Sequence, residues 1–165
     1  MSVRKHINIP VFIPHLGCPN TCVFCNQRAI SGSPDLNPDN LSFVTETIER
    51  TLSTAPPDAE REIAFFGGSF TGIDRDLMTA LLDIAAAYAA SGRISSIRLS
   101  TRPDYIDEEI ISILKKYPVG TVELGIQSMD DRVLAACRRG HTAERSRIAC
   151  AMRSEERRVG KECRS

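Results

Sequence analysis

Three cysteines lie within eight residues near the start of the chain, in the segment CPNTCVFC. Cys18, Cys22 and Cys25 have the spacing C-x3-C-x2-C, and no fourth cysteine stands close to them in the sequence. A disulfide uses thiols in pairs, and a structural zinc site is closed by four ligands. Three thiols on one loop therefore predict a metal centre with one position left open.

Two kinds of metal centre fit this spacing. Thiolates are the usual ligands of iron–sulfur clusters, so the cysteines can bind three irons of a [4Fe–4S] cluster and leave the fourth iron for another ligand. Zinc is the alternative, because His15 lies shortly before Cys18 and completes a Cys3His set. Buried cysteines acting as small apolar side chains are a weaker explanation, since Gly17 and Pro19 favour a tight loop.

Other residues with chemical potential follow later apolar segments. Gly67 and Gly68 allow the backbone to approach a ligand, although a plain turn explains them equally well. Arg102 precedes Pro103 and either contacts a ligand or is solvated. Gln127 lies just past an apolar segment, where its polar side chain can reach a ligand hydroxyl.

A pair of arginines, Arg138 and Arg139, precedes Gly140 at the end of a short helical pattern. An arginine can pair with a ligand carboxylate, and it is also favourable at a helix C-terminus. For Arg138 we favour the second explanation.

Strand and helix patterns alternate through the chain. Short apolar segments bounded by turn residues predict strands, and apolar residues at helical spacing predict helices. The expected strands are residues 7–13, 62–66, 97–100 and 121–126, and the expected helices are residues 41–52, 76–90, 107–117, 130–137 and 142–152. This alternation predicts an α/β fold with a parallel sheet, and in such folds active sites lie at the carboxyl ends of the strands. We therefore expect the cysteines, the glycine pair, Arg102 and Gln127 to converge on one face.

Composition excludes several classes of function. Lys+Arg and Asp+Glu are both 21 among 165 residues, so there is no bulk basic field to attract nucleic acid. No apolar run approaches a membrane span, and the start of the chain does not resemble a signal peptide. Six cysteines without an export signal indicate a reducing, cytoplasmic location rather than disulfides.

The last segment, residues 153–165, is polar and without periodicity, and it resembles translated adapter sequence from a sequencing library. We expect residues 1–152 to be one core domain truncated at its C-terminal end and residues 153–165 to be a non-native tail; a natural disordered tail is the alternative. Such a fragment is expected to be a poor enzyme, because its last strand has an unpaired edge.

The segment CPNTCVFC resembles the signature of the radical S-adenosylmethionine (SAM) superfamily, including the aromatic residue before the third cysteine. GGSFT, STRPD and VELGIQSMDDRVL…RRGHT resemble the radical core of the Elongator catalytic subunit and its bacterial relatives, and less closely oxygen-independent coproporphyrinogen oxidase. The resemblance covers residues 1–152. It is specific for the superfamily and much less specific for the substrate.

The resemblance implies a role for each matching residue. The three cysteines would bind the [4Fe–4S] cluster, and Phe24 would lie beside it. Gly67 and Gly68 would contact the methionine amino group of SAM through their backbone, with Ser69 in place of the usual glutamate. Ser100 also replaces a usual glutamate, which puts that contact to the cofactor in doubt. Gln127 would contact the ribose and Arg139 the methionine carboxylate.

The fold implied is the first four βα units of a six-unit, TIM-like (β/α)6 barrel. The activity implied is reductive cleavage of SAM to a 5′-deoxyadenosyl radical, which abstracts hydrogen from a substrate that the sequence leaves unidentified. An electron donor such as flavodoxin or ferredoxin and an RNA substrate are the partners that this resemblance suggests. Coproporphyrinogen decarboxylation is the first alternative, and a non-catalytic zinc module is the alternative of another class.

Overall fold

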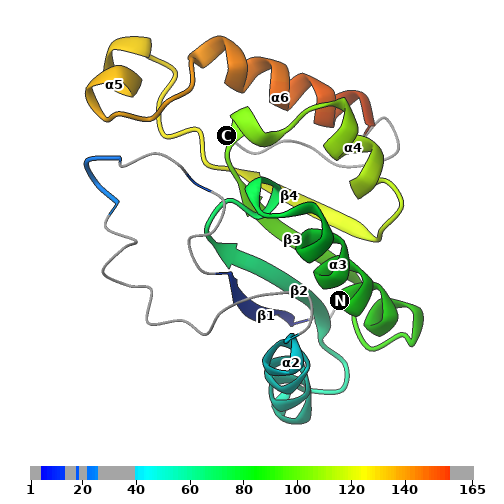
Figure 1. The fold of residues 1–165 in the computed structure, drawn as a ribbon. Helices are drawn as coiled ribbons and strands as arrows, with labels where there is room; N and C mark the ends of the chain where they lie inside the picture. The colour runs from blue at the N-terminus through cyan, green and yellow to red at the C-terminus, as the bar shows by residue number, and fades with distance from the viewer. Residues whose placement is uncertain (1–4, 14–17, 19–21, 26–39, 157–165) are drawn as a thin grey trace.

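Four strands form one parallel sheet in the order β1-β2-β3-β4 (Figure 1). The computed structural model describes residues 5–13, 18, 22–25 and 40–156. The strands are β1 (His6–Ile13), β2 (Glu60–Gly67), β3 (Ser96–Thr101) and β4 (Val119–Leu124). Each strand pairs with the strand before it in the chain, which is the order of consecutive βα units in a barrel.

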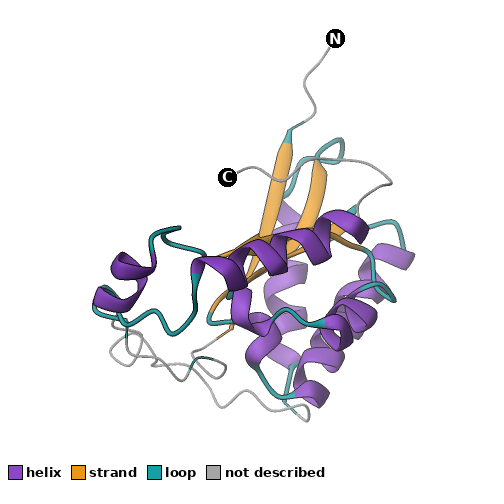
Figure 2. Ribbon diagram, turned by 90° about the horizontal axis from the view of Figure 1, so that it is seen from above, coloured by secondary structure: helices purple, strands orange, loops and turns teal. Residues whose placement is uncertain are grey.

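The helices follow the strands as the alternation predicts. The described α-helices are α2 (Ser42–Thr54), α3 (Arg75–Ala90), α4 (Glu108–Leu114), α5 (Asp131–Ala136) and α6 (Ala143–Glu156), and the short 3-10 turns η1 (Phe70–Gly72) and η2 (Pro103–Tyr105) follow β2 and β3. Asp74, Asp107 and Asp130 begin α3, α4 and α5, and their carboxylates accept hydrogen bonds from backbone N–H groups of the first turn. Helix α5 stands apart from the others (Figure 2).

One face of the sheet carries the hydrophobic core. Ile9, Ile63 and Ile97 are paired on neighbouring strands and are fully buried. Apolar side chains of α2, α3 and α4 pack against them in the same cluster. Burial of each such side chain stabilises the fold by about 1.5–3 kcal/mol, so this face holds the strands in their register.

The opposite face of the sheet carries an ion-paired group of charged side chains. The Arg98 guanidinium lies 2.9 Å from the Glu62 carboxylate and 2.7 Å from that of Glu123. Burial opposes ionisation of Glu62, but hydrogen bonds from Ser96 and Arg98 outweigh it and lower its pKa. An ion-paired ladder across β2, β3 and β4 suits the inside of a partial barrel, where polar groups need partners from neighbouring strands.

Some strands and helices begin or end at other residues than the sequence predicts. Strand β4 spans Val119–Leu124 and so lies two residues earlier than predicted at both ends, because the Ile126 N–H donates back to the Leu124 carbonyl at 2.9 Å instead of continuing the ladder. Helix α4 ends three residues early, ahead of Pro118, whose ring disfavours helical backbone in the preceding residue. Helix α6 continues to Glu156, past the boundary expected after Met152. The rest of the expected tail, residues 157–165, lies outside the described residues.

Within the described part of the chain, none of the helices combines the length and the apolar character that crossing a membrane requires.

Candidate cofactor site

A cavity of about 400 Å³ opens at the carboxyl ends of the strands, a size typical of small-molecule sites. All of the residues expected at the site line it: Cys18, Cys22, Phe24, Cys25, Gly67, Gly68, Ser69, Ser100, Arg102, Gln127 and Arg139. Thr101, Glu123, Leu124 and Gly125 complete the lining. The predicted convergence on one face is therefore observed, whereas the role of each residue stays a prediction.

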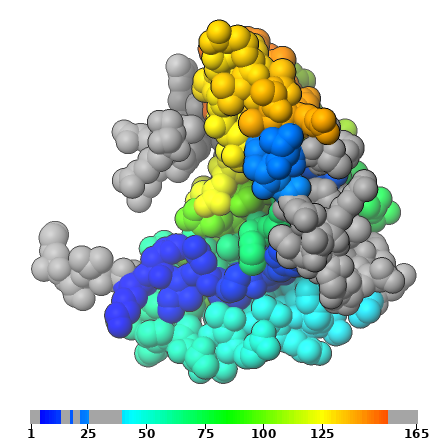
Figure 3. All heavy atoms as spheres, turned by 90° about the vertical axis from the view of Figure 1, so that its left-hand side faces the viewer, coloured from blue at the N-terminus to red at the C-terminus, as the bar shows by residue number. Residues whose placement is uncertain are grey.

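The cysteine segment closes one side of this cavity. The Cys25 N–H donates to the Cys22 carbonyl at 3.0 Å, and the Val23 N–H donates to the Cys137 carbonyl at 3.2 Å. The second bond attaches residues 22–25 to the end of α5, and the two segments lie side by side on the surface (Figure 3). The Phe24 side chain is half exposed at the rim.

The donor set fits an iron–sulfur cluster. The described cysteines are thiols and not disulfides. In the described part of the chain no three cysteine, histidine or carboxylate groups lie close enough to hold a single metal ion. A [4Fe–4S] cluster is bound by one thiolate per iron, so the three thiols that line this cavity suffice for three of its four irons. His15, the fourth ligand of the zinc alternative, lies outside the described residues.

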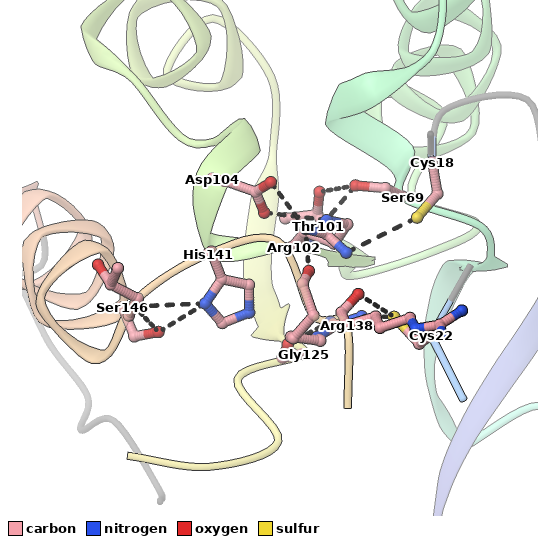
Figure 4. A network of polar contacts seen from close by, with 12 residues as sticks. Cys18, Cys22, Ser69, Thr101, Arg102, Asp104, Gly125, Arg138, His141 and Ser146 are labelled. Carbon is pink, nitrogen blue, oxygen red and sulfur yellow. Dashed lines mark hydrogen bonds and ion pairs between the residues drawn. The ribbon is translucent and has the colours of Figure 1, made fainter. Parts of the chain in front are cut away.

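Arg102 is buried, so the solvated arginine considered from the sequence is wrong. Only 3% of the residue is exposed. Its Nε and Nη2 donate to the two carboxylate oxygens of Asp104 at 2.9 and 2.8 Å, and Nη2 also donates to the Arg139 carbonyl at 2.6 Å. Its Nη1 points at the Cys18 sulfur at 3.7 Å (Figure 4). Arg102 thus connects three segments of the site.

The Ser69 hydroxyl is occupied by other protein groups. Its Oγ lies 2.8 Å from the Thr101 hydroxyl and accepts from the Arg102 backbone N–H at 3.2 Å. The Thr71 hydroxyl is 2.6 Å from the same Thr101 oxygen and donates to the Tyr105 carbonyl at 2.7 Å. This buried network joins the loops after β2 and β3. Ser69 therefore joins these two segments at the wall of the cavity.

Gly67 meets a steric requirement of the sheet. Its φ is 111°, and a Cβ added there would lie 2.6 Å from both the Ile13 carbonyl oxygen and the Phe12 ring. The neighbouring Gly68 N–H donates to the same Ile13 carbonyl at 3.0 Å. A plain turn therefore does not explain Gly67, because the backbone of β1 occupies the place of a side chain.

A Schellman motif after α5 separates the two arginines. The Arg139 N–H donates to the Leu134 carbonyl and the Arg138 N–H to the Ala135 carbonyl, with Arg138 at a φ of 54°. This turn leaves Arg138 exposed and buries Arg139 in the cavity wall. The Arg139 Nη1 lies 3.5 Å from the Cys22 sulfur, and Nη2 donates to the Gly125 carbonyl. Only Arg139 of the pair can meet a ligand in the cavity.

Glu123 is a carboxylate at the cavity that the sequence analysis did not select. It pairs with Ser100 in the register of β3 and β4, and the Ser100 hydroxyl donates to its Oε2 at 2.8 Å. A carboxylate is thus present in the cavity although Ser100 replaces the glutamate of the resembling family. The alternation of VELG places Glu123 and Gly125 on one face, but the register that sets Glu123 beside Ser100 is tertiary information.

His141 is buried beside the site. Its Nδ1 lies 3.3 Å from the Thr142 carbonyl and 3.4 Å from the Ser146 hydroxyl, and its Nε2 is buried without a hydrogen-bond partner among the described residues (Figure 4). Burial is the main cause of a lowered pKa for His141. The Thr142 carbonyl and the Asp104 carboxylate raise this pKa, and the smaller effects of the Arg139 and Arg102 charges lower it further.

We expect His141 to make the protein less stable at mildly acidic pH. With its pKa lowered on folding, the unfolded chain binds more protons below about pH 6.5, so the free energy of unfolding falls as pH drops through that value. Urea unfolding at pH 7.5 and pH 5.5 measures the change, and His141→Gln should remove much of it. The lowered pKa values of Glu49 and Glu62 act at lower pH, below their ordinary value of 4.5. An unchanged pH dependence in the variant contradicts the assignment to His141.

The sequence and the fold were compared with those of known proteins. The family described as the radical SAM superfamily matches residues 12–157. The chain belongs to the radical SAM superfamily. This membership confirms the resemblance found in the cysteine segment and speaks against the zinc module.

The relatives of this radical SAM chain include tRNA-modifying proteins. It is 29% identical over 114 residues to a tRNA uridine(34) acetyltransferase of Methanocaldococcus jannaschii. This match covers 59% of this chain and 21% of the relative. It is also 27% identical over 152 residues to the oxygen-independent coproporphyrinogen-III oxidase-like protein HemZ of Bacillus subtilis. This match covers 86% of this chain and 29% of the relative. The chain thus spans less than a third of the length of these two proteins.

The fold agrees with that of a solved archaeal protein. A solved structure of the archaeal Methanocaldococcus infernus Elp3 with an N-terminal deletion superposes with a TM-score of 0.58 at 20% identity, covering 90% of this chain and 35% of that one. The predicted α/β fold, a partial TIM-like barrel with a parallel sheet, is confirmed.

Proposed function

We propose that the chain is the cofactor-binding part of an enzyme that reductively cleaves SAM. The observation that carries this proposal is one cavity, in a radical SAM chain, lined by three thiols, a Gly-Gly turn, Gln127 and Arg139. When bound, the cluster supplies the electron that splits SAM into methionine and a 5′-deoxyadenosyl radical. The work of the protein is to bind, orient and shield these groups.

Each residue contributes through what it presents to the cavity. Cys18, Cys22 and Cys25 would hold the cluster. Gly67, the last residue of β2, and Gly68 present backbone without side chains at the cavity lining, where an amino group can be recognised. Gln127 adopts an unfavourable backbone conformation just past β4, as residues at ligand sites often do, and we assign it to the ribose.

We propose that the substrate is RNA and that the enzyme modifies it. The relatives named as tRNA-modifying enzymes support it, and a cytoplasmic location with a flavodoxin or ferredoxin as electron donor is part of the same proposal. Haem-related chemistry is the second candidate, supported by the similarity to the HemZ protein over most of this chain. An assay of the cluster-loaded protein with tRNA and with coproporphyrinogen III distinguishes the two.

The test of SAM cleavage is direct. Protein reconstituted anaerobically with iron and sulfide and reduced with dithionite should convert SAM to 5′-deoxyadenosine and methionine, detected by chromatography. The protein should be compared with a version extended at its C-terminal end by the matching part of a relative. Stoichiometric zinc, with no iron taken up on reconstitution, contradicts the proposal.

Arg139 is expected to bind the methionine carboxylate. Arg139→Ala should weaken SAM binding by about 1.5–3 kcal/mol, since a charge-assisted hydrogen bond is lost. The neighbouring Arg138→Ala is the matched control and should change binding much less, because that side chain is exposed. Equilibrium binding of SAM to the cluster-loaded protein measures both. Equal losses would mean that the two arginines act only as bulk charge.

A further inference from the structure

The guanidinium of Arg102 has a fixed orientation relative to the first cysteine. Asp104 takes the Nε and Nη2 edge with both carboxylate oxygens, at 2.9 and 2.8 Å. The remaining nitrogen, Nη1, faces the Cys18 sulfur at 3.7 Å (Figure 4). The guanidinium therefore lies between the Cys18 sulfur and the Asp104 carboxylate, so the positive charge is closer to the sulfur than the negative charge is.

This positive charge is buried and permanent. Arg102 is 3% exposed, so water screens its charge far less than that of a surface arginine. A guanidinium stays protonated in proteins, and the Asp104 carboxylate pairs with it at 2.8 Å. Its Nη2 also donates to the carbonyl of Arg139, whose own Nη1 lies 3.5 Å from the Cys22 sulfur.

We propose that Arg102 is a positioning residue that raises the reduction potential of the cluster held by the cysteines, and that Asp104 moderates this effect. The inference rests on the proposed function, since it requires a cluster at these thiols. Reduction adds one electron and so one negative charge to the cluster. Hydrogen bonds to the sulfurs and nearby positive charge stabilise that state, and a negative charge opposes it.

The experiment is an EPR-monitored redox titration of the reconstituted cluster in matched variants. Arg102→Gln should lower the equilibrium constant for one-electron reduction about tenfold, a shift of about 60 mV to lower potential. Arg102→Lys keeps the charge and should recover most of this loss. Asp104→Asn removes the counter-charge and should move the potential in the opposite direction, upward. Opposite signs at Arg102 and Asp104 identify electrostatic tuning, because simple loosening of the site would move both variants alike.

The chain offers a matched control on α5. Arg132 pairs with Asp130 at 2.8 Å with the same two-residue separation, and its side chain is 92% exposed. Arg132→Gln should leave the potential unchanged. A wild-type potential in Arg102→Gln at full iron content overturns the inference, as does a downward shift in Asp104→Asn. If Arg102→Gln does not hold iron, the signs of the shifts in Arg102→Lys and Asp104→Asn decide. A wild-type protein that takes up no cluster contradicts the proposed function instead.

Discussion

Replacing any one of Cys18, Cys22 and Cys25 by alanine is expected to abolish the iron–sulfur cluster. The reconstituted wild-type protein should contain about four irons and four sulfides and show the broad visible absorption of a [4Fe–4S] cluster. Each of the three thiols lines the same cavity, and each would bind a different iron. No described residue outside this set offers a replacement thiolate at the cavity lining, so each variant should lose the absorption and the iron together.

Two further cysteines serve as controls. Cys137 is the residue at the C-terminal end of α5, and Cys150 lies within α6. Neither lines the cavity. Cys137→Ala and Cys150→Ala should therefore keep the iron content and the absorption of the wild-type protein. Loss of the cluster in either control, or its retention in a variant of Cys18, Cys22 or Cys25, contradicts the assignment of the ligands.

Gly67→Ala is expected to destabilise the protein by about 2–6 kcal/mol, because two costs add. A non-glycine residue held at a φ of 111° costs about 1–3 kcal/mol. The new Cβ would also lie 2.6 Å from the Ile13 carbonyl oxygen, and forcing backbone apart in a packed sheet costs about 1–3 kcal/mol more. Urea unfolding of the variant and the wild-type protein measures the loss, and the cavity beside β2 should lose its shape.

Gly92→Ala separates the two costs. Gly92 ends α3 with a φ of 73°, and a Cβ there would meet no atom within 4 Å. This control should lose only about 1–2 kcal/mol, the cost of left-handed backbone in an L-residue. If Gly67→Ala lowers the free energy of unfolding no more than Gly92→Ala does, the predicted clash of the new Cβ with β1 is wrong.

Local patterns in the sequence predict the fold well. The helix over residues 76–90 was expected from its apolar spacing, and the structure begins it one residue earlier, at Arg75 after the Asp74 cap. The fourth strand was displaced by two residues, because Val122, Leu124 and Ile126 alternate evenly along the segment. Only the turn hydrogen bond from the Ile126 N–H to the Leu124 carbonyl shows where the strand ends. Periodicity reports which residues are buried together, and it reports the ends of elements less sharply.

The candidate site divides in the same way. The cysteine spacing, the glycine pair and the arginine before Gly140 are contiguous motifs, so the sequence by itself determined the superfamily and the segments that meet at the cavity. The orientation of Arg102 toward Cys18, the Ser69–Thr101 hydrogen bond and the approach of Glu123 to Ser100 were decided only by the tertiary structure. Each joins residues more than 20 positions apart through strand register and rotamer choice. A linear pattern carries no record of these, because they depend on how separate elements pack.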